Sequence, residues 1–111
     1  MPPYVPRKGD LVTLNFRPEA GHEQHGRRPA LVVSNDLFNH ATGFSLVCPI
    51  TRTDRSHPFH VPIPTGARAS GVVLADQLRS VDHGARGVRR LGRAPEGLLD
   101  DVLAIVDAVL V

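Results

Sequence analysis

The chain has 111 residues, which fits one domain spanning residues 1–111, and its hydrophobic share of 41% is enough to build a core. The single cysteine, Cys48, excludes an internal disulfide, and no apolar run is long enough to span a membrane. The N-terminus has no charged start ahead of an apolar stretch, so no signal peptide is predicted, and we expect a cytoplasmic protein.

Charge is distributed unevenly along the chain. Residues 95–111 hold four acids and no base, whereas the rest holds thirteen bases and seven acids, a net charge of +6. Twelve of the thirteen bases are arginine, the residue suited to bidentate phosphate contacts and to stacking on bases. A preference for arginine codons explains the choice over lysine but not the asymmetry. The basic part predicts an anionic partner, such as nucleic acid or an acidic peptide.

Apolar runs predict short strands at residues 11–16, 30–34, 44–50 and 59–63, one or two further strands at residues 72–75 and 78–81, and a last short strand at residues 86–91. In the first, Val12, Leu14 and Phe16 predict one apolar face. Pro62 places the fourth at an edge or a bulge. Residues 17–27 form a long polar loop, and residues 35–43 a short helical turn or loop capped by Asn35 or Asp36.

The C-terminal end predicts a helix. Pro95 suits the first helical position, and Glu96 suits the positive end of the helix dipole. The apolar positions recur at helical spacing, from Leu98 to Leu110. Several short strands followed by one helix favour a small, strongly curved β-barrel or a two-sheet α+β fold, with the helix covering the core.

The most informative stretch is the polar loop that ends at Arg27, Arg28 and Pro29 and runs into an apolar strand. Pro29 removes a backbone donor and disfavours helix at Arg28, so Arg28 is predicted to be extended, at the mouth of a rigid strand. The side chain of Arg27 is expected on the opposite face. Loops held this way often carry functional side chains, here including Glu23.

This stretch is part of a wider resemblance. Gly9-Asp10-Leu11-Val12, Glu23-Gln24, Gly26-Arg27-Arg28-Pro29-Ala30, Cys48-Pro49-Ile50-Thr51 and Ala75-Asp76-Gln77-Leu78 resemble, in order and spacing, the MazF/PemK family of toxin endoribonucleases. The resemblance implies an SH3-like barrel with a C-terminal α-helix, mainly β in class. It also implies a homodimer, a cognate MazE-like antitoxin with an acidic segment, and contact with operator DNA only through the antitoxin complex.

The residue types fit cleavage of RNA without a metal. If the 2′-hydroxyl attacks the adjacent phosphorus, the site needs a base, a fixed cation on the phosphoryl oxygens and a further donor. Glu23 is the candidate base, Arg28 the phosphate-binding cation and Thr51 the hydroxyl donor. Such a reaction leaves a 2′,3′-cyclic phosphate and a 5′-hydroxyl, and it requires RNA rather than DNA.

By resemblance, Arg28 and Thr51 match the catalytic arginine and threonine of the family, and Glu23 its loop glutamate. Some members are thought to use the arginine as base and acid. Because arginine stays charged in nearly all proteins, Glu23, or His22 or His25 nearby, ranks above it as base. Arg52 departs from a common pattern in which a second hydroxyl follows the threonine.

The remaining candidates are contacts to the RNA strand and its bases. The residues predicted to bind RNA are Arg27, Pro29, Arg52, Arg55, Asp76, Gln77 and Arg86, with Arg17 and Arg79 as further backbone contacts. His22, Glu23 and His25 are an incomplete ligand set, so no metal and no cofactor is expected. Cys48 lies in an apolar run and is interpreted as a buried hydrophobe rather than a nucleophile.

A second reading comes from a different functional class. The chain could be a CcdB-like toxin that binds and poisons DNA gyrase and cleaves nothing. The Gly26-Arg27-Arg28-Pro29 and Thr51 motifs favour the nuclease, a toxin that cuts single-stranded mRNA at a short motif and so inhibits translation and growth.

Overall fold

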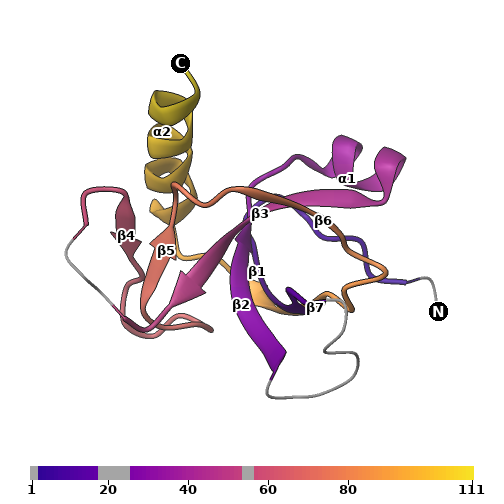
Figure 1. Ribbon diagram of the computed structural model, residues 1–111. Helices are drawn as coiled ribbons and strands as arrows, with labels where there is room; N and C mark the ends of the chain where they lie inside the picture. Colours follow the sequence, from indigo (N-terminus) through magenta and orange to yellow (C-terminus); the bar gives the residue numbers. More distant parts are fainter. Residues whose placement is uncertain (1–2, 18–25, 54–56) are drawn as a thin grey trace.

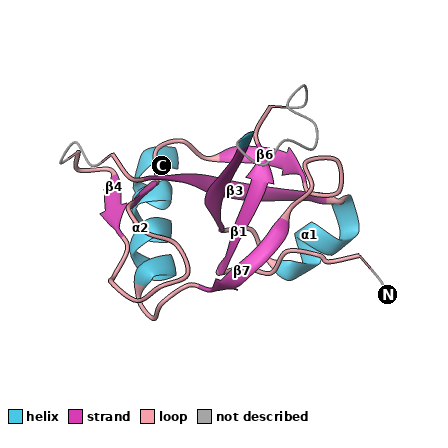
Figure 2. Ribbon diagram, turned by 90° about the horizontal axis from the view of Figure 1, so that it is seen from below, coloured by secondary structure: helices cyan, strands magenta, loops and turns pink. Residues whose placement is uncertain are grey.

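The computed structural model describes residues 3–17, 26–53 and 57–111. Seven strands and two helices follow one another along the chain (Figure 1): β1 (Asp10–Asn15), β2 (Arg27–Val32), α1 (Asp36–Thr42), β3 (Phe44–Thr51), β4 (His60–Pro62), β5 (Val72–Leu74), β6 (Arg79–Asp82), β7 (Arg89–Arg93) and α2 (Leu98–Leu110). The two helices lie at opposite ends of the sheet in both views (Figure 2).

All strand pairs are antiparallel, in the order β4-β5-β3-β2-β1-β7. β3 is the central strand: β6 pairs with its first half, at residues 44–47, and β5 pairs with its last two residues. Among the described strands, β4 and β7 end this order and do not pair with each other, so the sheet is not closed. The predicted fold class, mainly β with a C-terminal helix, is confirmed in this open, barrel-like form. β4 lies at an edge, as Pro62 predicts.

Both faces of the central strands are buried. Leu11, Leu31 and Cys48 belong to a core cluster that also contains Leu98, Val102 and Val106 of α2. Side chains that alternate with these along the strands belong to a second cluster, together with Val81 of β6. Its members are Val12, Leu14, Ala30, Val32, Val47 and Val81. The predicted apolar face of β1, with Val12, Leu14 and Phe16, packs in this second cluster. On the opposite face of β1, Leu11 joins the cluster that contains α2 residues, whereas Thr13 lines a groove.

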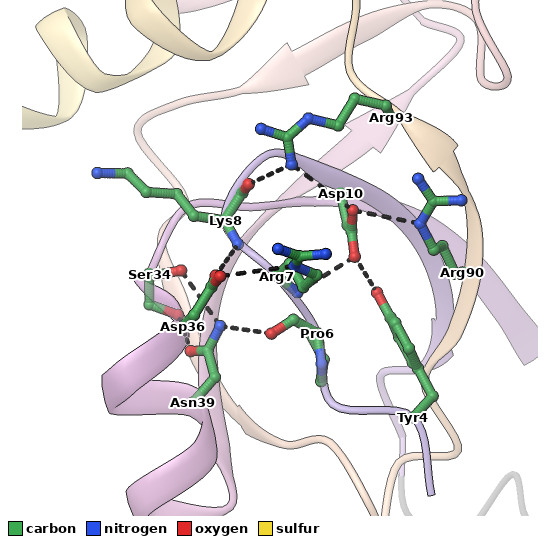
Figure 3. A network of polar contacts seen from close by, with 10 residues as sticks. All are labelled: Tyr4, Pro6, Arg7, Lys8, Asp10, Ser34, Asp36, Asn39, Arg90 and Arg93. Carbon is green, nitrogen blue, oxygen red and sulfur yellow. Dashed lines mark hydrogen bonds and ion pairs between the residues drawn. The ribbon is translucent and has the colours of Figure 1, made fainter.

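α1 is fixed by its cap and by one buried amide. Asn35 accepts a hydrogen bond from the Phe38 backbone N–H at 2.8 Å, which confirms the predicted helical turn and its cap. The Asn39 side chain is fully buried, where it donates to Pro6 O at 2.9 Å and accepts from the Ser34 hydroxyl. These bonds hold the N-terminal segment against α1 (Figure 3).

A second polar centre ties the same segment to β7 (Figure 3). The Asp10 carboxylate is buried, and it accepts hydrogen bonds from the Tyr4 hydroxyl and the Arg7 backbone N–H. Arg90 Nε donates to it at 3.3 Å, and Arg93 forms an ion pair with it at 3.9 Å. Burial and the bond to Asp10 raise the pKa of Tyr4 above its usual range. The buried charge is thus matched by donors from two segments, the N-terminal segment and β7.

Three elements have bounds that differ from prediction by more than one residue. β2 covers Arg27–Val32, where residues 30–34 were predicted. α2 begins at Leu98 rather than Pro95, because Gly97 adopts a left-handed φ of 88° that a helix cannot continue through. The Leu98 N–H donates to Pro95 O instead, which closes a turn. β7 covers residues 89–93 rather than 86–91, since residues 84–88 form a hydrogen-bonded turn. α2 has 13 residues, and no described helix is long and apolar enough to cross a membrane.

Candidate functional site

A groove of about 980 Å³ lies where the start of β2, the end of β3 and the turn at residues 64–71 meet. Its described lining is Thr13, Phe16, Arg27, Arg28, Pro29, Pro49, Ile50, Thr51, Arg52, Thr53, Ala67, Arg68, Ala69, Ser70, Gln77, Arg79 and Leu91. Arg28 and Thr51, which are far apart in the sequence, thus reach the same cavity. They do so because β2 and β3 pair antiparallel, with Ala30 opposite Pro49.

The groove is strongly basic. Five arginines and no acidic residue line it within the described part of the chain. The acids of the C-terminal segment lie instead on and before α2, where Asp100, Asp101 and Asp107 are exposed. A concave surface with charges of one sign concentrates oppositely charged ligands. The charge of this groove therefore suits the predicted anionic partner.

Arg28 is extended, as predicted. β2 begins at Arg27, and Arg28 pairs with Leu14 of β1, while Pro29 pairs with Thr13. The Arg28 side chain is exposed, and within the described residues it has no hydrogen-bond or ion-pair partner. Its guanidinium therefore keeps all five N–H donors available for a ligand in the groove.

Thr51 is held from two sides. It is the last residue of β3, and its hydroxyl oxygen accepts the Thr53 backbone N–H at 3.2 Å, so the hydroxyl hydrogen remains free to donate into the groove. On the other side, Gly71 (φ 114°) packs so closely that a Cβ there would lie 2.1 Å from Thr51 O. The Thr51 backbone is consequently clamped between its own strand end and the turn at residues 64–71.

Arg27 is already engaged by the protein. Its Nη2 donates to Thr13 O at 2.9 Å, to Thr13 Oγ1 at 3.0 Å and to Gly87 O at 2.6 Å. Burial, and to a lesser extent the charge of Arg89, lower the pKa of Arg27. These bonds tie the start of β2 to β1 and to the turn before β7. Arg27 lines the groove but also supports the backbone that presents Arg28.

The other predicted RNA-binding residues are divided between the groove and its surroundings. Pro29, Arg52 and Gln77 line the groove, as does the predicted backbone contact Arg79. Asp76 is exposed and lies outside the lining.

Neither Arg17 nor Arg86 lines the groove, although Arg86 forms hydrogen bonds with residues at one of its walls. The Arg86 guanidinium donates to Phe16 O, and its backbone carbonyl accepts the Asn15 N–H at 3.0 Å. The Arg79 guanidinium lies 4.9 Å from the centre of the Phe16 ring. Arg86 therefore fixes the end of β1 that places Phe16 in the groove, and Arg17 is exposed.

Sequence reasoning did not single out Arg68, Phe16 or Ser70 as groove residues. Arg68 is flanked by Ala67 and Ala69, which are half-buried and pack against the core. An arginine between two small apolar residues in a turn is the one local signal that marks it, since the alanines anchor the turn and leave the arginine outside.

Some predicted residues lie outside the described part of the chain. They are Glu23, Arg55, His22 and His25. In the described residues there is no group of three or more histidine, cysteine or acidic side chains placed to hold a metal ion.

Cys48 is fully buried in the core between Leu31 and the α2 cluster. Burial, together with the negative charge of Asp76, raises the pKa of Cys48 to about 12. The thiolate is the reactive form, and at neutral pH it is scarce at such a pKa. This agrees with the interpretation of Cys48 as a buried hydrophobe.

Comparison with known proteins identifies the relatives of this chain. Residues 7–110 match the family described as PemK-like, MazF-like toxin of type II toxin-antitoxin system. The endoribonuclease toxin MazF of Escherichia coli K12 is 44% identical over 96 residues, covering 86% of each chain. The endoribonuclease PemK of Escherichia coli is 38% identical, covering 93% of this chain and 80% of its own.

Solved structures agree with these relatives. MazF of Deinococcus radiodurans superposes with a TM-score of 0.87 at 46% identity, covering 97% of this chain and 98% of its own. A MazE-MazF structure from the same organism gives a TM-score of 0.86 at 41% identity, covering 97% of both chains. The relatives named as endoribonucleases favour the nuclease over the gyrase-binding alternative. The chain belongs to the PemK/MazF family of type II toxin-antitoxin toxins.

Proposed function

We propose that this chain is the toxin of a toxin-antitoxin pair and a metal-independent endoribonuclease. It cuts single-stranded RNA, chiefly mRNA, at a short sequence motif, and in this way it inhibits translation and growth. The observation that carries the proposal is the presence of Arg28 and Thr51 in one groove whose described lining holds five arginines and no acid.

In the proposed reaction the 2′-hydroxyl of the nucleotide before the cut attacks its own 3′-phosphorus. The guanidinium of Arg28 binds the phosphoryl oxygens and stabilises the charge that develops on them, while the Thr51 hydroxyl donates to the same group. The bond from phosphorus to the 5′-oxygen breaks as that oxygen takes up a proton. The products are a 2′,3′-cyclic phosphate and a 5′-hydroxyl. Glu23, or His22 or His25, removes the proton from the 2′-hydroxyl.

Base recognition relies on the rest of the lining. Gln77 offers both a donor and an acceptor for base edges, and Arg52 and Arg79 offer donors for phosphates. Arg55, Asp76 and Arg86 complete the set of residues that we assign to RNA binding, with Arg27 and Pro29 at the start of β2. Single-stranded RNA fits this site because its bases are free to turn toward the wall of a groove.

The proposed assembly is a homodimer that a MazE-like antitoxin inhibits. MazE-MazF complexes of Deinococcus radiodurans supply the precedent for the antitoxin. The exposed end of α2, where Val109, Leu110 and Val111 are 51%, 71% and 97% exposed, is an apolar surface available to a second copy. Sedimentation at micromolar concentration should give a species of twice 12.0 kDa, and a purely monomeric species would contradict the dimer.

The nuclease itself is tested by incubating the purified protein in EDTA with an RNA and with a DNA of the same sequence. We expect cleavage of the RNA only. If cleavage disappears with the chelator and returns with a divalent ion, the metal-independent mechanism is wrong. If no RNA is cut while gyrase is inhibited, the protein is a gyrase poison instead.

A further inference from the structure

The turn at residues 64–71 forms a rigid wall of the groove. Ala67 and Ala69 pack against the core, and the Ile63 N–H donates to Gly71 O at 2.9 Å. Gly71 in turn lies against the carbonyl of Thr51. The turn is therefore attached at several points, and Arg68, between the two alanines, projects from a fixed support.

Arg68 crosses β7 at the one position where that strand has no side chain. A Cβ placed on Gly92 would lie 2.6 Å from Cγ and 3.3 Å from Cβ of Arg68. Contacts below 3 Å are not tolerated by real side chains, so any residue larger than glycine at position 92 would displace the Arg68 stem. The neighbouring Leu91 lines the groove beside it. The absence of a side chain at Gly92 thus leaves the space in which the Arg68 stem packs along the wall of the groove.

The Arg68 guanidinium is exposed, and within the described residues it has no acidic or carbonyl partner. A cation that serves only the fold usually pairs with an acid or covers apolar surface, whereas this one faces a groove whose described lining contains no acid. Because its stem is already fixed, less side-chain entropy is lost when it binds a ligand.

We propose that Arg68 binds a backbone phosphate of the RNA beside the one that is cut, and that Gly92 is the positioning residue that seats it. This inference rests on the proposed function and assigns to that groove a second phosphate contact, separate from Arg28. Since the phosphate assigned to Arg68 does not react, this contact holds the RNA strand equally in the ground state and in the transition state. Its loss should raise KM and weaken RNA affinity while kcat changes little.

Affinity is measured with a single-stranded RNA of mixed sequence that carries 2′-fluoro groups throughout, which cannot react through a 2′-hydroxyl. The variants are Arg68→Ala, Gly92→Ala, the double variant and Arg7→Ala. Arg7 is the matched control because the same charge is removed outside the groove, from an exposed ion pair with Asp36. Circular dichroism melting is recorded for each variant, so that a folding defect in Gly92→Ala is recognised.

Arg68→Ala should weaken binding about 3- to 10-fold and lower the slope of log affinity against log salt by about 0.7, the value for one phosphate contact on a single strand. Gly92→Ala should weaken binding in the wild-type background but have no further effect once Arg68 is alanine. Arg7→Ala should leave the slope unchanged.

Three results would overturn the inference or part of it. Equal slopes for Arg68→Ala and Arg7→Ala would remove Arg68 from the RNA surface. A further loss from Gly92→Ala in the Arg68→Ala background would show that Gly92 acts otherwise than through Arg68. A large fall in kcat for Arg68→Ala, with binding intact, would place it in the chemical step. Because the affinity probe cannot be cut, failure of the proposed cleavage would not hide the first two outcomes, while the third is measured by single-turnover cleavage of the unmodified RNA.

Discussion

At the scale of single residues, the central question is what Arg28 does with its free guanidinium. If it binds two phosphoryl oxygens with parallel donors, lysine cannot reproduce the planar arrangement. We expect Arg28→Lys to lower kcat by at least about 10²-fold, in line with the loss of a preorganised donor, while RNA affinity falls much less. Single-turnover cleavage and RNA affinity measure the two quantities. Folding should survive, since Arg28 is exposed.

The control for this variant follows from the structure. Arg27→Lys is the obvious neighbour, and it would be a mild control if the Arg27 side chain only occupied the face opposite Arg28, as the sequence led us to expect. The hydrogen bonds from Arg27 to Thr13 and Gly87 rule this out, because lysine cannot make them all. Arg7→Lys, at an exposed ion pair away from the groove, is the better control. Equal and near-wild-type rates for Arg28→Lys and Arg7→Lys would remove Arg28 from the active site.

The extended conformation of Arg28 was predictable because its cause is local, namely the adjacent Pro29. The role of Arg68 was not predictable, because its position depends on Gly92, a residue distant in sequence that approaches only through the fold. The hydrogen bonds of Arg27 were hidden for the same reason. Local chemistry identifies reactive residue types, and long-range packing decides which of them are already occupied.

At the scale of elements, Gly71 connects the wall of the groove to Thr51. Gly71→Ala combines a left-handed φ with a Cβ 2.1 Å from the Thr51 carbonyl. We expect it to destabilise the fold by at least about 2 kcal/mol, since a left-handed φ alone costs roughly 1–2 kcal/mol for a residue with a Cβ. Displacement of Thr51 should also lower kcat. Urea unfolding and single-turnover cleavage test the two effects.

Gly66→Ala is the matched control for this substitution. Gly66 lies in the same turn with a φ of 96°, but nothing lies within 4 Å of a Cβ placed there. It should show the cost of the left-handed backbone and leave kcat unchanged. If Gly66→Ala and Gly71→Ala lower kcat equally, the contact with Thr51 does not position the active site.

Elements whose signals are local matched their prediction. α1 starts after Asn35 because the Asn35 side chain caps it, and β3 ends at Thr51. Other features were not visible in the sequence. Leu11, on the opposite face of β1 from Val12 and Leu14, joins the core cluster that contains α2 residues. α2 starts at Leu98 rather than at Pro95 because Gly97 has a left-handed φ, a conformation that glycine allows but that cannot be predicted from its presence alone.

At the scale of the whole molecule, charge is separated between the groove and α2. The five arginines of the groove suit RNA and also suit an acidic peptide. We expect a cognate antitoxin with an acidic, extended segment to bind and inhibit, with an affinity that falls as salt rises. Titration at increasing salt concentrations tests this, and an affinity independent of salt would contradict the charge-based part of the proposal.

The asymmetry of charge was visible in the sequence, but its location in space was not. The strand order, with β5 and β6 both paired to β3, brings arginines from four separate segments to one cavity. No local pattern encodes that order. The pattern of strands and helix allowed either a small barrel or a two-sheet α+β fold, and the family resemblance decided between them.

Attack by the 2′-hydroxyl in this groove is the central step of the proposed function. Its direct test is end-group analysis of an RNA oligonucleotide cut in EDTA, beside the same oligonucleotide with a single 2′-deoxy nucleotide before the cut. We predict a 2′,3′-cyclic phosphate and a 5′-hydroxyl from the first and no cleavage at that site in the second, although it still binds. Cleavage of the deoxy-substituted strand, or products with 5′-phosphates, would contradict the mechanism.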